Sequence, residues 1–397
     1  MNWKSISLIS VLITVAISGS WANITIESNR IQTDSVLTEK KTFKQKADSF
    51  NLFMERVIQL FPVPIFSISK ETGMLFGLTK FNDFNMGSTE SQDSIAQPST
   101  FTGLIYYTQK KQFKINFETD IMFRENSKNV KGRITFLNFP LLFYGVGNET
   151  IKADAVTVLY ETFEFVGSYS HRVKPNFFAG ITYKYLNDIK VEYTDTTETS
   201  PLIHNYNVSQ NKGLRSGLGV HFTYEGRDNR LNPFHGSYMN VEFDFFKSWL
   251  GSDFNYNRLI IDLRKYIPLI DSNKLVLATQ VIGEFVSDGA NIQALPALGG
   301  PNWGARGVYF GRFRDKSSLT ANMELRFPLF WILGGTAFAG VGQVGPNLAA
   351  FDWSGNHYTY GGGLRLMVSS KNRVNLRLDM GFSKDDSAFI LSFSEAF

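Results

Sequence analysis

The sequence predicts an all-β protein, a transmembrane β-barrel of sixteen antiparallel strands preceded by a short N-terminal helix. Three observations lead to this prediction. From residue 62 onward apolar and polar residues alternate, aromatic residues make up 15% of the chain, and no later apolar run reaches the length of about 18 residues that a transmembrane helix needs. Alternation with a period of two places one face of a strand in an apolar environment and the other in water.

The segment 374–383, VNLRLDMGFS, illustrates the alternation, because its even-numbered residues are apolar and its odd-numbered residues are polar or glycine. The same pattern occurs in 113–123, 239–245 and 258–264. A soluble β-sandwich is the alternative, since its apolar faces meet each other. Repeated charges on the polar face, strands of roughly nine to eleven residues and aromatic residues at strand ends favour the membrane barrel.

With an even number of strands, the chain enters and leaves the barrel on the same side, which in single-chain bacterial barrels is the periplasmic side. The expected strands are 62–70, 74–84, 99–108, 112–123, 130–138, 156–170, 176–191, 212–225, 237–248, 253–266, 274–286, 318–328, 334–343, 358–369, 373–383 and 387–397. The last of them, with Phe389, Leu391, Phe393 and Phe397 on one face, resembles the export signal of bacterial outer-membrane barrels.

The N-terminal part divides into two segments before a barrel domain at 62–397. Residues 1–22 are predicted to be a signal peptide, with Lys4, an apolar core at 6–17 and small residues at 20–22; a membrane anchor is the alternative. Residues 23–61 are predicted to be a periplasmic segment with an amphipathic helix. That helix either packs under the barrel or serves at a membrane surface or a partner.

Composition and motifs argue against several classes of function. The chain has no cysteine and a modest net charge of +4, so we expect no disulfide, no thiolate metal site and no nucleic-acid partner. The five histidines are scattered and no catalytic motif is present, so we expect no enzyme, metal or cofactor. Ser216 and His221 are a weak candidate for a lipase pair. The run 361–363, GGG, is expected to be a bend or a thin patch on the lipid side.

The connection 287–317 is the longest in the C-terminal half and contains GARGVYFGRFRDK, which begins at residue 304. Loops of this length are usually functional or disordered. Arg306 carries a planar, permanently charged group that suits a lock onto a carboxylate, and Gly307 permits close approach of the backbone. Alternatively, the arginines bind lipopolysaccharide phosphates at the surface.

Four segments of the chain carry a family resemblance. They are Arg306-Gly307-Val308-Tyr309, Glu324-Leu325-Arg326, RDNRLNPFHG at 227–236, and PVPIFSISKETGMLFG at 62–77. With these segments, residues 62–397 resemble the BamA/TamA-type outer-membrane assembly barrels, the bacterial surface antigen family. The resemblance implies that the loop folds into the lumen and is locked by Arg306, Gly307, Tyr309 and Glu324, next to a basic cluster of Arg312, Arg314 and Asp315.

The chain departs from the family pattern in three places. Val308 follows Arg306-Gly307 where an aromatic residue is usual, so Tyr309 is expected to take that place. Residues 338–342 lack the aspartate that the family often has on strand 13, which leaves Glu324 as the expected partner of Arg306 without a second carboxylate. Residues 23–61 are too few for a POTRA domain, so a barrel-only member is expected.

The resemblance implies a barrel in the outer membrane of a Gram-negative bacterium that assists insertion or translocation of proteins or lipids. The alternatives are a passive, porin-like channel and a structural surface antigen. The implied partners are outer-membrane lipids and lipopolysaccharide, together with client outer-membrane proteins or a periplasmic partner. The sequence does not predict an oligomeric state.

The closing seam between the first and last strands is predicted to be the weakest pairing of the barrel. Pro62 and Pro64 lack amide donors, and Glu395 interrupts the apolar face of the last strand. We therefore expect weak pairing of 62–68 with 391–397, where a lateral opening toward lipid would start, with Phe393 and Phe397 on the other side of the seam. Alternatively, the prolines only end a strand at the interface.

Overall fold

The structure is a computed structural model that describes residues 61–69, 73–86, 97–193, 201–206, 211–270, 275–299 and 305–397, with six isolated residues between 49 and 60. The predicted signal peptide, 1–22, and nearly all of the amphipathic helix predicted within 23–61 lie outside these residues. The following description concerns the unit formed by residues 48–397.

Sixteen strands form one sheet in this part of the chain, and the predicted fold class is confirmed. The strands are β1 (Val63–Ser69), β2 (Gly73–Phe84), β3 (Ser99–Thr108), β4 (Phe113–Met122), β5 (Lys128–Phe143), β6 (Val156–Lys174), β7 (Phe177–Tyr193), β8 (Gly213–Glu225), β9 (Gly236–Phe246), β10 (Tyr256–Pro268), β11 (Val276–Val286), β12 (Ser317–Phe330), β13 (Leu333–Gly345), β14 (His357–Ser369), β15 (Val374–Ser383) and β16 (Ser387–Phe393).

Helical structure in the described barrel is limited to short pieces in the connections. They are α3 (Pro201–Asn205) and the 3-10 turns η2 (Arg124–Asn126), η3 (Lys152–Asp154), η5 (Ser248–Leu250), η6 (Ile292–Ala294) and η7 (Leu348–Ala350). All of them join strands, so the sheet alone forms the wall.

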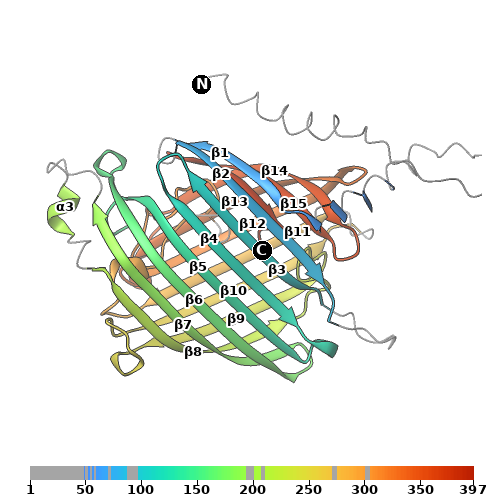
Figure 1. Cartoon of the computed structure of the whole chain (residues 1–397), viewed down its shortest axis with the longest axis horizontal. Coiled ribbons are helices and arrows are strands. Elements are labelled where there is room, and N and C mark those ends of the chain that lie inside the picture. Colours follow the sequence, from blue (N-terminus) through green and yellow to red (C-terminus); the bar gives the residue numbers. More distant parts are fainter. Residues whose placement is uncertain are drawn as a thin grey trace, which may run out of the picture. The chain divides into compact units, whose positions relative to one another are not determined.

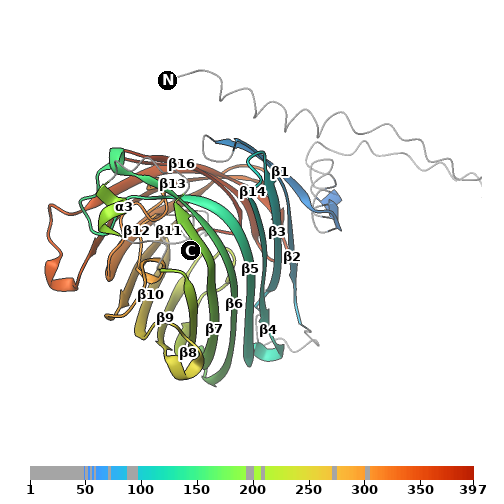
Figure 2. The same ribbon diagram turned by 60° about the vertical axis from the view of Figure 1, so that its left-hand side comes forward.

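Each strand pairs antiparallel with its neighbours in the chain, and the sheet curls into a barrel (Figures 1 and 2). We call the end with the connection between β11 and β12 the outer end and the opposite end the periplasmic end. Strand length varies strongly around the wall, from 19 residues in β6 to 7 in β1 and in β16.

The two faces of the wall reverse the usual preferences of a soluble protein. On β14, Tyr358 and Tyr360 are exposed, whereas Thr359 and Arg365 are buried. The same pattern of exposed apolar and buried polar residues occurs around the sheet, because successive residues of a strand face lipid and lumen alternately. Buried charges therefore line the inside of the barrel, which is where the predicted lock residues lie.

Several strand ends shift by two to five residues from the expectation, and two of these shifts have a clear physical reason. β5 continues to Phe143 rather than ending at 138, because its outer part packs in an apolar cluster with β6 and β7. β16 ends at Phe393 rather than at 397. Ser394 has a φ of 64°, and this left-handed conformation turns the remaining residues away from the strand direction.

Candidate functional site

Arg306 lies at the centre of the site, with only 2% of its surface exposed. Its Nη1 is 2.7 Å from Oε2 of Glu324 on β12 and 2.7 Å from Oδ2 of Asp379 on β15. The structure thus brings together the predicted pair Arg306 and Glu324. It also corrects the expectation of a single carboxylate, because Asp379 supplies a second one from a strand that the family pattern did not indicate.

One row of residues across four strands forms the floor under this arginine. Glu324 of β12 is opposite Phe338 of β13, Phe338 is opposite Gly361 of β14, and Gly361 is opposite Gly381 of β15. The guanidinium carbon of Arg306 is 3.6 Å from the centroid of the Phe338 ring. A cation so close to a buried ring face is favourable, and favours this placement of the loop in addition to the ion pairs.

Glycines make room for this arrangement. A Cβ atom on Gly361 would lie 2.5 Å from the Phe338 ring, and one on Gly381 would lie 2.7 Å from the Arg306 backbone. A Cβ on Gly363 would lie 2.1 Å from Oδ1 of Asp379. Gly361 and Gly363 therefore face the lumen, and the expectation that residues 361–363 are a thin patch on the lipid side is wrong for these two.

Gly307 continues the close contact on the loop side. Its φ is 114°, and a Cβ there would lie 2.6 Å from the backbone of Phe382. Its carbonyl oxygen accepts a hydrogen bond from Oγ of Ser383 at 2.9 Å. Only glycine fits both the backbone conformation and the available space, so the Arg-Gly pair is fixed on β15 as well as on β12.

The carboxylates of the lock belong to a larger network of buried charges in the lumen. Its members are Arg306, Glu324, Arg326, Arg365, Arg377, Asp379 and Glu395. Arg326 Nε is 2.7 Å from Glu324, and Arg365 is 2.6 Å both from Asp379 and from Glu395. The network connects the outer loop with the segment that follows β16.

The other predicted loop residues have separate partners. Arg312 is 3.2 Å from Asp385 and 3.5 Å from Asp386, both in the connection between β15 and β16. Arg314 donates to the carbonyls of Gly311 and Ile292, each at 3.3 Å. Burial lowers the pKa of the Arg314 guanidinium. The structure therefore does not bring these arginines together around one acid.

Asp315 and Tyr309 take positions that the sequence did not specify. Oδ1 of Asp315 accepts a hydrogen bond from the backbone amide of Lys316 at 2.8 Å. The Tyr309 ring packs edge-on against Tyr144 at 5.8 Å, and its hydroxyl accepts from the amide of Leu142. Val308 is buried in an apolar cluster with Leu298, Ala305, Phe313 and Val344, so Val308 and Tyr309 pack against different neighbours.

The three loop arginines are buried, with 2%, 4% and 7% of their surface exposed for Arg306, Arg312 and Arg314. Side chains so enclosed by protein groups are poorly placed to reach phosphates on a membrane surface. The geometry therefore favours an internal lock over the alternative of surface lipopolysaccharide binding by these three residues.

The predicted seam residues lie in three different environments. Pro62 precedes β1, and Pro64 lies within it opposite Leu78 of β2. Phe393 ends β16 and stacks on Phe81 of β2, with ring centroids 5.0 Å apart.

Phe397 lies away from the seam. It is buried in the lumen against Tyr266, Val276 and Ala278, and its carbonyl oxygen accepts from Arg326 at 2.9 Å. Phe397 is not a seam residue, because the turn at Ser394 carries it inward.

The weak candidate for catalysis does not assemble. Ser216 and His221 occupy opposite faces of β8; the hydroxyl of Ser216 lies 3.2 Å from that of Tyr183, and Nδ1 of His221 lies 3.1 Å from Oγ1 of Thr182. Within the described residues, no group of three or more His, Asp or Glu side chains is arranged to hold a metal ion.

Sequence reasoning missed Asp379, Phe338 and Arg365. Asp379 and Arg365 each lie on the polar side of an alternating strand, which indicates a lumen position but not a partner. Phe338 was noted only as part of an element that lacks its aspartate. Strand register decides which of these meet, and alternation does not specify register.

The fold and the lock define an outer-membrane barrel with an inward-folded, arginine-locked loop. The family model of the Omp85 superfamily domain matches residues 94–394, and the chain belongs to this superfamily. The resemblance deduced from the motifs is thereby confirmed at this level. Members of this superfamily such as BamA and CdiB are outer-membrane barrels of Gram-negative bacteria. No curated protein matches the sequence.

Three solved structures are similar to this chain, two of them with a TM-score above 0.5. CdiB from Acinetobacter baumannii is 11% identical, with 84% of this chain and 58% of that chain covered and a TM-score of 0.53. CdiB from Escherichia coli is 11% identical, with 84% and 60% covered and a TM-score of 0.52. BamA from Haemophilus ducreyi lacking POTRA domains 1–3 is 14% identical, with 87% and 76% covered and a TM-score of 0.47. The chain spans less than two thirds of the length of both CdiB chains.

Proposed function

We propose that this barrel assists the insertion or translocation of proteins at the outer membrane. The observation that carries the proposal is the buried bridge from Arg306 to Glu324 and Asp379, which fixes a long outer loop inside the barrel. A passive channel has no need of a loop held by two carboxylates and a ring. Membership of the Omp85 superfamily supports the same function.

The proposed route is the seam between β1 and β16. Within the described residues each of these strands pairs with one neighbour, and each is 7 residues long. Strands that span a membrane need roughly 9–11 residues. A short, singly paired edge on each side is the part of the wall that can separate with the loss of fewest backbone hydrogen bonds. We propose that an opening at this seam faces membrane lipids and lipopolysaccharide.

Reconstitution separates this proposal from the channel alternative. The full chain is placed in liposomes, an unfolded eight-stranded outer-membrane barrel is added from urea, and its folding is followed by protease resistance. We expect faster folding than in empty liposomes, loss of that gain with Arg306→Ala, and retention with Lys316→Ala, an exposed loop change. A steady open-channel current without any gain in client folding would establish the passive channel instead.

A further inference from the structure

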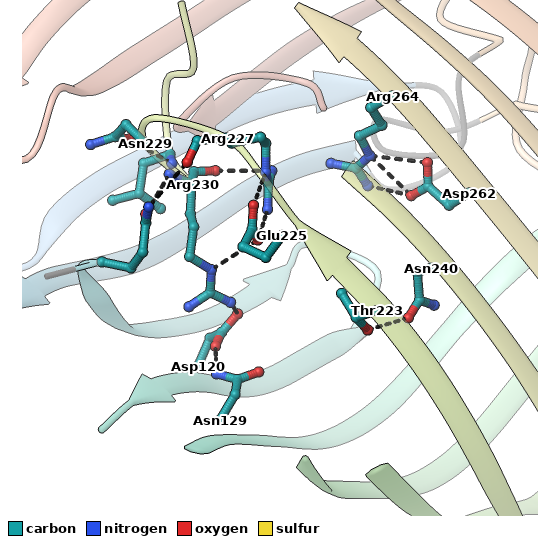
Figure 3. Close-up of polar contacts among 12 residues, drawn as sticks. Asp120, Asn129, Thr223, Glu225, Arg227, Asn229, Arg230, Asn240, Asp262 and Arg264 are labelled. Atoms are coloured by element: carbon teal, nitrogen blue, oxygen red, sulfur yellow. Dashed lines mark hydrogen bonds and ion pairs between the residues drawn. The ribbon is translucent and has the colours of Figure 1, made fainter. Parts of the chain in front are cut away.

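The connection between β8 and β9, residues 226–235, belongs to the periplasmic end of the barrel. Figure 3 shows its residues Arg227, Asn229 and Arg230 among their polar contacts. Arg227 and Asn229 are buried there. Arg230 reaches across to β4, where its Nη2 is 2.5 Å from Oδ2 of Asp120. A connection between two adjacent strands needs no such reach, so its contacts serve something other than joining β8 to β9.

One group of contacts lies on the β1 side of the seam. Gln97, just before β3, donates from Nε2 to the carbonyl of Arg227 at 3.2 Å and accepts from the amide of Arg230 at 3.1 Å. Together with the pair between Arg230 and Asp120, these contacts bind the connection to the periplasmic ends of β3 and β4. Both strands follow β1 and β2 in the sheet order.

A second group lies on the β16 side. Asp228 is 2.6 Å from Nη1 of Arg373, and Asn229 donates to the carbonyl of Asn372 at 3.2 Å. Both partners belong to the connection between β14 and β15. The amide of Glu395, just after β16, donates to the carbonyl of Leu231 at 3.2 Å.

The connection therefore holds the two sides of the seam, whose own strands β1 and β16 stand at opposite ends of the sheet order. We propose that residues 226–235 are a clasp that ties the two sides of the periplasmic end of the seam together, and that release of this clasp lets the seam widen. The proposal goes beyond the proposed function, because it concerns how the seam is held, whatever passes through it.

The character of the contacts suits a clasp that releases. Most are hydrogen bonds and ion pairs between side chains and turns, which exchange for water more readily than a continuous backbone ladder. The connection also borders a polar cavity of about 210 Å³. Its lining residues include Pro98, Thr100, Asp120, Lys131, Tyr238 and Arg264. The space gives the turn room to move without displacing strands.

The test measures the width of the seam directly. Nitroxide labels are attached to Phe101→Cys on β3 and Leu391→Cys on β16, two exposed positions in a chain without native cysteine, and their distance is measured by pulsed electron resonance in lipid nanodiscs. Arg230→Ala cuts the contact to β4. Arg373→Asn cuts the contact to Asp228 and retains a residue that tolerates the φ of 57° at this position.

Arg264→Ala is the matched control. Arg264 is an arginine of the same periplasmic end, but its partner Asp262 lies on its own strand, β10 (Figure 3). We expect a single short distance for the parent and for Arg264→Ala, and a second, longer population for either clasp variant. Because the two sides are held in series, the double variant should add little to the larger single effect.

Two results would overturn the clasp. One is a folded Arg373→Asn variant, with the heat resistance of the parent, whose distances match the parent's. The other is a longer population of equal size in Arg264→Ala. If Arg230→Ala does not fold, the exchanged pair Asp120→Arg with Arg230→Asp replaces it and must restore the parent distances. Client folding plays no part in this measurement, so its outcome is distinct from that of the proposed function.

Discussion

The wall formed by β12–β15 and the seam between β1 and β16 are held in opposite ways. The wall has long ladders on both edges of each strand and carries the loop lock on its inner face. The seam strands have 7 residues each and one paired neighbour each. Across the seam, the stack of Phe81 on Phe393 supplies a side-chain contact in place of a ladder.

The difference indicates which side of the seam is fixed. β16 pairs with β15, and β15 contributes Asp379 and Gly381 to the lock. Glu395, two residues beyond β16, is bound by Arg365 of the same wall. The β16 side is therefore anchored to the lock, whereas the β1 side depends on its pairing with β2. Motion at the seam should be larger on the β1 side.

Removing the lock should have the largest effect. Arg306→Ala removes the cation shared by two buried carboxylates, which keep Arg326 and Arg365 as their closest partners, and we expect a cost of up to about 3–5 kcal/mol. We expect folded protein to unfold on gels at a clearly lower temperature, and Glu324→Ala to do the same. Since the two residues act on one contact, the double variant should be far less harmful than the sum of the single ones. Additive losses would show that the pair does not act as a unit.

The glycine of the lock is the next most sensitive point. Gly307→Ala and Gly251→Ala both place a side chain at positive φ, 114° and 84°, at a strain of about 1–3 kcal/mol. The alanine Cβ at 307 would also meet the Phe382 backbone, whereas nothing lies within 4 Å of that at 251. Protease cleavage of the loop should accelerate for Gly307→Ala alone. Equal cleavage of both variants would mean that backbone strain, and not the contact with β15, makes the loop sensitive to protease.

The strands were predictable from the sequence because lipid and lumen impose opposite requirements on successive residues. The wall is one layer thick, so each position shows its face directly in its polarity. This is why β15 was predicted to within a residue at its start. The alternation of polar and apolar residues is less regular at the outer end of β5, and its extension beyond residue 138 was therefore not predicted.

The lock was only half predictable. The Arg-Gly motif and Glu324 carry a recognisable pattern, but Asp379 and Gly363 have meaning only through register, which places them opposite each other. Phe397 was misplaced because its apolar character suits a strand facing lipid as well as a lumen cluster with Tyr266 and Val276. The left-handed backbone of Ser394 places Phe397 in the lumen, and the polarity of the sequence does not predict this backbone conformation.

The stack across the seam should have a smaller effect than the lock. Phe393→Leu keeps an apolar side chain of similar size but removes the stacking with Phe81, which is worth about 0.5–1.5 kcal/mol. Amide exchange in β1 and β2 should accelerate while that in β12–β15 stays unchanged. Phe382→Leu, which removes a ring stacked on Tyr360 inside the paired wall, is the control. Equal acceleration in both variants would argue against a special role of the seam.

The exposed ion pair of Lys316 with Asp288 should have the smallest effect. The hydrogen bond from Lys316 lowers the pKa of the Asp288 carboxyl, so whatever the pair contributes is present at neutral pH and is lost as the pH falls through that lowered pKa. Water and salt screen such a pair on both sides, because the side chains are 44% and 89% exposed. Lys316→Ala should therefore leave the unfolding temperature unchanged from pH 7 downward and at any salt concentration. A shift as large as that of Arg306→Ala would show that the loop is held by its charge in general rather than by the buried geometry of one arginine.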